Sequence, residues 1–155
     1  MVSKKTIYDP DTHYVPSKVS KVKRNYQCAA YDHETVHKAL DRGLLCHIGY
    51  VIDAQPYVTP TIYCRKDKRL YWHGSSASKM LKSMRDGVRV CLSVTDFCGL
   101  VLARSGFHHS ANYRSVMAFG IAHLLTDSQE KEEVLDLLME RIAPGRNAFM
   151  RPHTN

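Results

Sequence analysis

The sequence predicts a single α+β domain that is mainly β, with antiparallel strands curled into a small barrel and helices at its rim. The 155 residues are enough for one hydrophobic core and too few for two. The apolar residues fall into several short runs, some of which alternate with polar residues at the period of a strand. Two hairpins in succession, then one helix and further strands, differ from the strand–helix alternation of a parallel sheet.

The first half of the chain predicts one helix and three strands. Apolar and small residues recur at helical spacing at Val36, Ala39, Leu40 and Gly43. We therefore expect a helix over residues 34–43, capped by Asp32 or His33 and ended by Gly43. The β-branched and apolar runs that follow predict strands at 45–52, 56–64 and 70–73. A turn at 53–55 joins the first two strands into a hairpin.

The second half predicts two helices and three more strands. A helix follows a Gly/Ser-rich turn and ends at Gly87, with its apolar positions at Ala77, Met80, Leu81 and Met84. Strands are expected at 88–95, 99–104 and 113–125, the last two flanking a polar segment at 105–112. Asp127 and Glu130 form a D-x-x-E capping box, which opens a helix that ends at Pro144-Gly145.

The ends of the chain differ in composition from its middle. We expect an extended basic arm at 1–25, the folded domain at 26–146 and a tail at 147–155. The formal net charge is +7, and residues 1–24 carry four of these positive charges. Such an arm is usually solvated. Although it can touch phosphates without sequence specificity, we predict no specific nucleic-acid partner.

Composition also bears on the compartment. No apolar run approaches the ~18 residues of a membrane span, and the N-terminus lacks the apolar stretch of a secretory signal. The five cysteines are odd in number and contain no C-x-x-C, which is typical of reduced, intracellular thiols. We therefore expect a cytoplasmic protein without a membrane partner.

Residues His33–His37 spell H-E-x-x-H, the pattern of zinc peptidases. That chemistry needs a third ligand, and the extended motif has glycine at position 40, where this sequence has Leu. Glu34 in a first helical turn is explained by the helix dipole alone. We interpret the pair as two partly exposed histidines and predict no metal site.

The segment Gly74–Lys79, which we call the serine–lysine segment, contains the parts of a simple phosphate site. A strand delivers the chain to a helix N-terminus, where free N–H groups, serine hydroxyls and one lysine favour an anion. A plain serine N-cap beside a solvated lysine explains the same residues equally well. On composition alone the two interpretations remain open.

Three other features bear on a binding site. Pro60 cannot donate to a strand ladder, so one side of its strand is expected to face an edge, a bulge or a ligand. His73 comes directly before the serine–lysine segment. The densest polar cluster, at 105–115 with Arg104 before it, is either a site or interface, or a capped hairpin loop with exposed histidines.

These segments, in this order, resemble the pyridoxamine 5′-phosphate oxidase-related flavoproteins, the FMN-binding split barrels. Within them they are most similar to the flavin-nucleotide-binding branch that contains the nitroimidazole-resistance proteins. The resemblance runs from about Lys23 to Arg151. The residues that carry it are Leu45–Val51, Gln55–Tyr63, Leu70–Met80, Gly99–Val116 and Pro144–Arg146.

The resemblance implies a Greek-key split β-barrel that pairs as a homodimer, with FMN at the subunit interface. Ser78 and Lys79 match the positions that hold the FMN phosphate, with Ser75 and Ser76 nearby. The strand whose backbone runs along the isoalloxazine matches Thr59, Pro60, Thr61, Ile62 and Tyr63. Ser115 matches a polar contact from the last barrel strand, and Arg104, His108 and Arg114 are further candidates for the cofactor or the dimer contact.

We therefore expect an FMN-dependent oxidoreductase that passes hydride or electrons from NAD(P)H to a small acceptor, in the manner of a nitroreductase or flavin reductase. His73 matches a histidine near the flavin and is the candidate catalytic residue, polarising the substrate or delivering a proton. The alternative is a flavin-binding or haem-handling protein without turnover.

Two departures from the oxidases proper concern the C-terminal end. Arg151-Pro152-His153 copies the letters of their R-x-H substrate motif, and we treat this match as coincidence. Because relatives often continue beyond this point, we expect that part of the substrate wall is missing from this chain.

Overall fold

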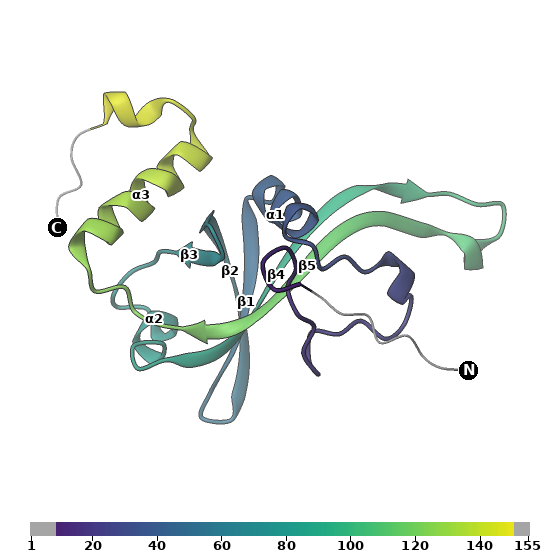
Figure 1. Cartoon of the computed structure of the whole chain (residues 1–155), viewed down its shortest axis with the longest axis horizontal. Coiled ribbons are helices and arrows are strands. Elements are labelled where there is room, and N and C mark those ends of the chain that lie inside the picture. The colour runs from purple at the N-terminus through teal and green to yellow at the C-terminus, as the bar shows by residue number, and fades with distance from the viewer. Residues whose placement is uncertain (1–8, 151–155) are drawn as a thin grey trace.

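The computed structural model describes residues 9–150 (Figure 1). Its elements are η1 (Tyr26–Cys28), α1 (His33–Arg42), β1 (Leu45–Ile52), β2 (Gln55–Lys66), β3 (Arg69–Trp72), α2 (Lys79–Ser83), β4 (Val88–Val101), η2 (Gly106–His108), β5 (Ser110–Ala122), α3 (Ser128–Ile142) and η3 (Arg146–Phe149). The outer parts of the predicted arm and tail, 1–8 and 151–155, lie outside the described residues, as does Arg151-Pro152-His153. No described helix is long and apolar enough to cross a membrane.

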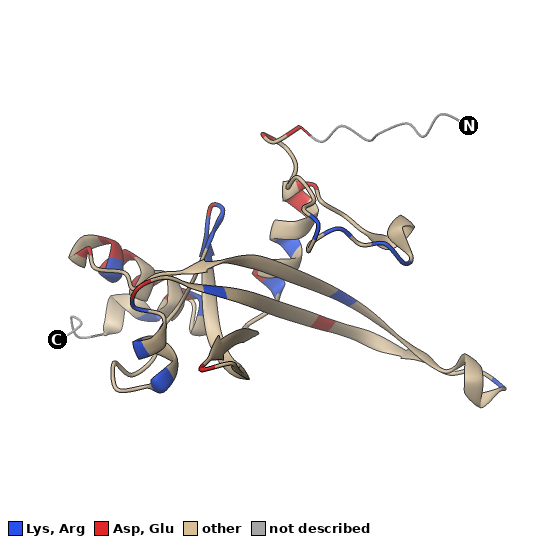
Figure 2. Cartoon of the chain, turned by 90° about the horizontal axis from the view of Figure 1, so that it is seen from below, with Lys and Arg blue, Asp and Glu red and all other residues tan. Residues whose placement is uncertain are grey.

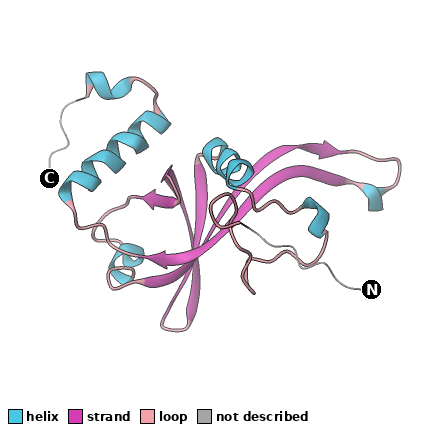
Figure 3. Ribbon diagram, viewed as in Figure 1, coloured by secondary structure: helices cyan, strands magenta, loops and turns pink. Residues whose placement is uncertain are grey.

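The five strands form one antiparallel sheet in the order β3-β2-β1-β4-β5 (Figure 3). β1, β2 and β3 follow one another through tight turns, and β4 returns after α2 to lie on the free side of β1. This order is a Greek key. The predicted fold class, mainly β with antiparallel strands and peripheral helices, is confirmed.

Local signals in the sequence set the element boundaries. Asp32 accepts a hydrogen bond from the Thr35 amide at 2.7 Å and caps α1. Asp53 and Ala54 both have positive φ, which gives β1 and β2 a two-residue turn, one residue shorter than predicted. Asp127 caps α3 through the Glu130 amide at 2.7 Å.

Four predicted elements differ from the structure. The expected strands at 88–95 and 99–104 are one strand, β4, because a bulge between Phe97 and Gly99 bends it without breaking its pairing with β5. β5 is 110–122 rather than 113–125, since residues 110–112 of the predicted polar segment pair with β4 through their backbone. The helix expected to run to Gly87 is only α2, which ends at Ser83 with Met84 as its C-cap.

The sheet has one covered and one largely open face. The inner face forms the main core with α1 and α2, and its most buried members are Tyr63, Ile48, Val94 and Cys46. A second cluster lies on the opposite face, where Val134 and Leu138 of α3 cover Cys64 of β2. Burial raises the pKa of the Cys46 thiol to about 12, so this cysteine acts as a small apolar residue.

Arg141 of α3 fixes the helices to the strand that carries the candidate site. Its Nη2 donates to the Leu40 carbonyl at 2.8 Å and to the Gly43 carbonyl, at the end of α1. Its guanidinium lies 5.0 Å from the centre of the Tyr63 ring in β2. The Tyr63 hydroxyl also donates to the Leu40 carbonyl. One cation therefore connects α3, α1 and β2, and a positive charge at a helix C-terminus is favourable.

The histidines of the H-E-x-x-H pattern hold the N-terminal segment. The His33 and His37 rings stack at 5.7 Å, and the Tyr14 ring lies 4.6 Å from His33. The Tyr14 hydroxyl is hydrogen-bonded to His37 Nε2 at 2.9 Å. Glu34 is paired with Lys38 at 2.5 Å, on the exposed surface of α1. The pattern thus anchors residues 12–14 to the helix.

We expect mild acid to weaken this anchor. Burial, reinforced by Arg65 and His33, lowers the pKa of His37 below its ordinary 6.5. The unfolded chain therefore binds the proton more readily, so this contribution to stability is present above about pH 6.5 and is lost as the pH falls through the lowered pKa. Urea unfolding between about pH 7.5 and about pH 5.5 should show a larger loss of stability for the wild type than for His37→Gln. An identical loss in both proteins would contradict this assignment.

Candidate functional site

The serine–lysine segment forms the turn between β3 and α2. Ser78 is the N-cap of α2, and its hydroxyl accepts from the Leu81 amide at 3.1 Å. The Ser75 hydroxyl accepts from the Ala77 amide at 3.2 Å, and the Ser75 carbonyl accepts from the Ser78 amide at 2.9 Å. Ser75 and Ser76 are exposed. The segment is therefore an ordered turn with hydroxyl groups at the surface.

Lys79 connects this turn to β2. Its Nζ donates to the Tyr57 hydroxyl at 2.9 Å and lies 4.9 Å from the centre of the Tyr57 ring. The hydrogen bond to Tyr57 raises the pKa of Lys79, so the lysine stays cationic. Tyr57 stacks on Tyr50 at 5.6 Å, and the Tyr50 hydroxyl is 3.0 Å from Thr59 Oγ1. A fixed positive charge thus lies beside the Tyr57 ring, on the residue that directly follows Ser78.

β2 offers a free edge next to this cluster. β3 pairs only with residues Tyr63–Lys66 of β2, so among the described residues the edge of β2 from Gln55 to Ile62 that faces away from β1 is unpaired. Pro60 lies in this part of the strand, opposite His47 of β1. The prediction that one side of the Pro60 strand faces an edge is therefore confirmed.

The predicted residues of β2 have different surroundings. Thr59 points to the inner face with Tyr50, and the Tyr63 side chain is fully buried in the core. Ile62 packs against the α3 cluster on the opposite face. The backbone of β2, with the half-buried Thr59 and Thr61, is therefore what remains available to a molecule at the free edge. His73 follows β3 and is exposed beside the serine–lysine segment.

Arg114 and Ser115 lie elsewhere on the chain. Arg114 Nη1 is 3.2 Å from Cys98 Sγ and 3.5 Å from Asp96 Oδ2, which also binds Arg42 at 3.0 Å. Cys91 of β4 pairs with Gly49, which precedes Tyr50 of the Lys79–Tyr57–Tyr50 cluster. Asp96 is five residues farther along β4, which is about 17 Å of strand. Adjacent strand residues point to opposite faces, so Arg114 and Ser115 do not face one ligand together. Within one chain these two residues and the serine–lysine segment are separate.

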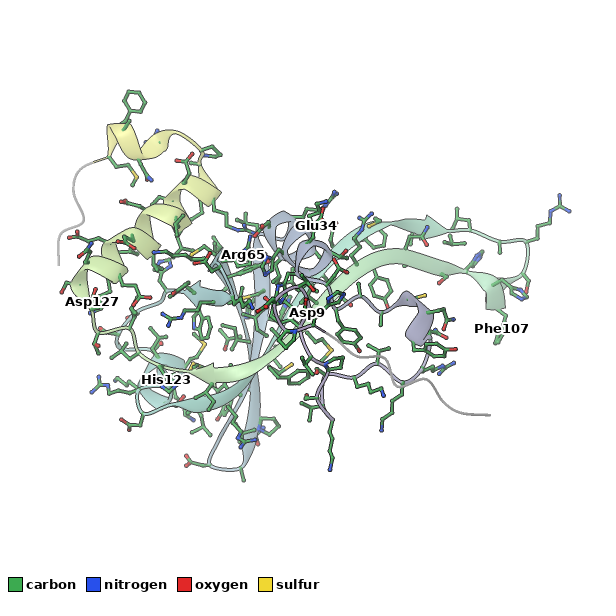
Figure 4. The ribbon with its side chains drawn as sticks, in the orientation of Figure 1. Asp9, Glu34, Arg65, Phe107, His123 and Asp127 are labelled. Carbon is green, nitrogen blue, oxygen red and sulfur yellow. The ribbon has the colours of Figure 1, made fainter. Side chains whose placement is uncertain are left out.

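The polar cluster at 105–115 includes the far end of the β4–β5 hairpin. Figures 1 and 4 show this hairpin extending away from the sheet, with Phe107 at its end. The Ala103 amide donates to His109 Nδ1 at 3.0 Å, and η2 forms the turn. Arg104 and His108 are both exposed here.

Sequence reasoning missed the open face of the sheet, which we call the outer face. Strand register places apolar side chains of β1, β2, β4 and β5 on it, each 43–68% exposed: Val51, Val58, Phe97, Tyr113, Met117, Phe119 and Ile121. A monomer rarely exposes a continuous apolar patch of this size. The alternation within residues 113–121 was the available signal, but it does not say which face is covered.

Charge is unevenly distributed over the chain (Figure 2). Acidic residues gather on α3, whereas Lys79 and Lys82 lie on α2 and basic residues follow the N-terminal segment. The end of the sheet that carries the serine–lysine segment therefore favours an anion over a cation.

Residues 32–155 match the sequence profile of the family described as pyridoxamine 5′-phosphate oxidase. The chain belongs to this family. The match covers the whole sheet, the serine–lysine segment and α3. No curated protein matches the chain.

Several solved structures are similar to this member of the family. The flavocytochrome Anf3 from Azotobacter vinelandii is 40% identical with a TM-score of 0.82, over 90% of this chain and 64% of its own. The FAD and heme binding protein from Mycobacterium smegmatis is 35% identical with a TM-score of 0.75, over 80% and 60%. This chain thus spans less than two thirds of either protein.

A third structure supports the fold alone. A candidate 5-nitroimidazole antibiotic resistance protein from Bacteroides thetaiotaomicron is 20% identical with a TM-score of 0.57, over 80% of this chain and 70% of its own. The predicted resemblance to the oxidase-related split barrels is confirmed by the family, and the fold is shared with this third structure.

Proposed function

We propose that this protein binds FMN, with the flavin phosphate at the serine–lysine segment and the ring system along the free edge of β2. The observation that carries the proposal is the Lys79 ammonium held by Tyr57, on a residue that directly follows the turn with Ser75, Ser76 and Ser78. Hydroxyl donors and one fixed cation suit a phosphate dianion. Membership of the family and the two more identical neighbours, whose names include a flavin or a flavocytochrome, support it.

The residues present fit the rest of the cofactor. The unpaired backbone of β2 at 59–62 supplies carbonyl and amide groups for the polar edge of the ring. Pro60 has no N–H, and on this unpaired side of the strand that costs no hydrogen bond to a neighbouring strand. Thr59 adds a hydroxyl near the cluster. His73 is exposed beside the serine–lysine segment, and we assign it to hold a proton and deliver it to the substrate.

We propose an oxidoreductase activity for the loaded protein, with NAD(P)H as donor and a small molecule as acceptor. Bound flavin supplies hydride and single-electron transfer, while this chain binds and orients it and sets its electrostatic surroundings. Lys79 places a positive charge near the phosphate. The cytoplasm, where the donor is abundant and thiols stay reduced, is the compartment that fits this activity.

We propose a homodimer formed through the outer face. The seven apolar side chains of this face expose on the order of 600 Å² in each chain. A standard interface covers about 800 Å² per partner, so the face is large enough to form most of one. A second copy of the chain covers this face on both subunits at once, because a two-fold axis brings the same patch to both sides of the interface.

Haem is the second candidate ligand. The two neighbours of higher identity are named as a flavocytochrome and as a FAD and heme binding protein. Nine histidines give this chain possible axial ligands. A haem-handling or purely flavin-storing role therefore stands as the alternative to turnover.

The visible spectrum of the purified protein, followed by reconstitution of the stripped protein with FMN, FAD or hemin, tests this proposal. We expect a flavin doublet and saturable one-to-one binding of FMN per chain. A Soret band without flavin would favour the haem alternative. Failure to bind either flavin under conditions where the protein is folded would refute the proposal.

A further inference from the structure

Residues 15–30, which we call the basic loop, form a closed loop before α1. The two ends of this loop are held together, because the Tyr14 amide donates to the Tyr31 carbonyl at 2.8 Å. Tyr14 in turn packs on His33 and His37 of α1. A compact surface loop whose ends lie side by side is an Ω-loop, and loops of this kind are frequently functional.

Hydrogen bonds inside the basic loop fix its shape. The Lys21 amide donates to the Ser17 carbonyl at 3.0 Å, and the Ser17 amide donates to the Ser20 hydroxyl at 2.8 Å. The Tyr31 hydroxyl accepts from the Val22 amide at 2.7 Å and donates to the Ser20 carbonyl at 3.3 Å. The backbone is therefore ordered although most side chains of the loop are exposed. These side chains are presented to solvent in a fixed arrangement.

The basic loop carries four positive charges and no negative charge. No acidic residue occurs between Asp11 and Asp32. The four cations are all exposed, and no ion pair between described residues includes any of them: Lys18, Lys21, Lys23 and Arg24. A surface with this unbalanced positive charge attracts anions.

Apolar side chains are interleaved with these cations. Val19 is 69% exposed and Tyr26 is 73% exposed, and Val15 and Val22 are exposed as well. A partner that offered only charge would leave the valines in water. The interface of a bilayer instead takes up apolar side chains and aromatic rings, while Lys and Arg reach the headgroups.

The composition of the basic loop favours a lipid surface over a nucleic acid. Proteins that bind single strands combine cations with several aromatic rings on which bases stack, and the loop has one ring, Tyr26. Three of its four cations are lysines, which act as point charges, whereas arginine is the residue that recognises single phosphates in a fixed geometry. Lysine next to valine therefore suits an extended anionic surface that also has an apolar interior.

The position of the basic loop leaves it exposed in the proposed dimer. The loop rests on α1 through Tyr14, and α1 packs on the covered face of the sheet. A dimer formed through the outer face therefore does not bury the loop. Figures 1 and 2 show the N-terminal segment well separated from α2, so the serine–lysine segment stays accessible when the loop contacts a surface.

We propose that the basic loop binds this protein to an anionic lipid surface, with Val19 and Tyr26 in the headgroup region and the four cations against acidic headgroups. The sequence predicted no membrane partner because it contains no spanning segment, and a peripheral contact of this kind needs none. The inference does not depend on the proposed flavin site.

Vesicle flotation of the full chain tests the inference. Vesicles of phosphatidylcholine alone are compared with vesicles of phosphatidylcholine mixed with phosphatidylserine. The charge variant carries Lys18→Gln and Lys21→Gln, and the apolar variant carries Val19→Ser and Tyr26→Ser. All four side chains are exposed, so urea unfolding should show that both variants fold as the wild type does.

Lys131→Gln with Arg146→Gln is the matched control, because it removes two exposed positive charges from α3 and η3. The wild type and this control should float with the mixed vesicles and not with phosphatidylcholine alone. The charge variant should bind the mixed vesicles about 30-fold more weakly, since each cation near an anionic surface contributes about fivefold. The apolar variant should bind about tenfold more weakly, because less apolar area leaves water. Added salt should release the wild type.

A tryptophan in the basic loop reports directly on its contact with lipid. The chain has one tryptophan, Trp72 of β3, so Tyr26→Trp adds a single reporter. The emission of Tyr26→Trp should shift to the blue when the mixed vesicles are added, and lipid with brominated chains should quench it. The emission of the wild type should stay unchanged under the same conditions.

Other outcomes would overturn the lipid assignment. These are a wild type that does not float with the mixed vesicles at low salt, a charge variant that binds as tightly as the matched control, or a bound Tyr26→Trp without the shift. Tight binding of an oligonucleotide by a wild type that ignores vesicles would make nucleic acid the partner. FMN titration is read separately: the charge and apolar variants should keep the wild-type affinity, and a folded wild type that binds no FMN would refute the proposed function alone.

Discussion

Replacing Arg141 with methionine should lower the free energy of unfolding by about 2–4 kcal/mol, because two carbonyls lose a charged donor at ~1.5 kcal/mol or more each. The lost partners are the Leu40 and Gly43 carbonyls at the end of α1. The cation over the Tyr63 ring is also removed. Methionine keeps much of the side-chain volume, and the partnerless Nε of Arg141 disappears, which limits the loss. Urea unfolding at constant pH measures the effect.

Two controls make this measurement specific. Tyr63→Phe removes only the hydroxyl that donates to Leu40 and should cost about 1 kcal/mol. Arg146→Met changes an exposed arginine four residues after α3 ends and should leave stability nearly unchanged. If Arg141→Met and Arg146→Met had the same free energy of unfolding, the contacts of Arg141 that join α3, α1 and β2 would contribute nothing to stability.

Replacing Lys79 with alanine should weaken FMN binding by about 10- to 100-fold, since a charge-assisted contact is worth about 1.5–3 kcal/mol. The loss has two parts: the phosphate loses its cation, and Tyr57 loses its hydrogen-bond partner. Adding Ser78→Ala should weaken binding further, although it also removes the N-cap of α2, worth about 1 kcal/mol of stability. Isothermal titration with FMN measures both variants.

Lys82→Ala is the matched control for charge, because Lys82 is an exposed lysine on the same short helix. It should change FMN affinity less than threefold at physiological ionic strength, where exposed charges are screened beyond about 8 Å. Lys79→Arg should retain part of the affinity. Equal losses for the Lys79 and Lys82 variants would mean that a general positive charge, rather than a built phosphate site, attracts the cofactor.

Much of the fold follows from local signals. The caps at Asp32 and Asp127, the turn at Asp53-Ala54, the apolar run of β1 and the alternation in β4 act within a few residues, so sequence alone predicts them. The continuity of β4 does not follow, because backbone pairing with β5 carries it through the bulge at Phe97–Gly99. The role of Arg141 was also hidden, since its partners are about a hundred residues away in the chain.

Part of the candidate site also follows from local sequence, and part does not. Ser78 and Lys79 are neighbours in sequence, and the structure joins them to Tyr57 of β2. Arg114 and Ser115 were grouped with them by resemblance, yet they lie farther along the sheet and point to opposite faces. A resemblance assigns residues to a cofactor without saying which subunit supplies them. The exposed outer face is the feature of the structure that bears on that assignment.

Comparing FMN with riboflavin in one equilibrium titration tests the central claim most directly. The two flavins share the ring system and ribityl chain and differ by the phosphate alone. The wild type should bind FMN at least 100-fold more tightly than riboflavin, about 2.7 kcal/mol, and Lys79→Ala should reduce that preference to within tenfold. Equal affinity of the wild type for both flavins would contradict a phosphate site at the serine–lysine segment.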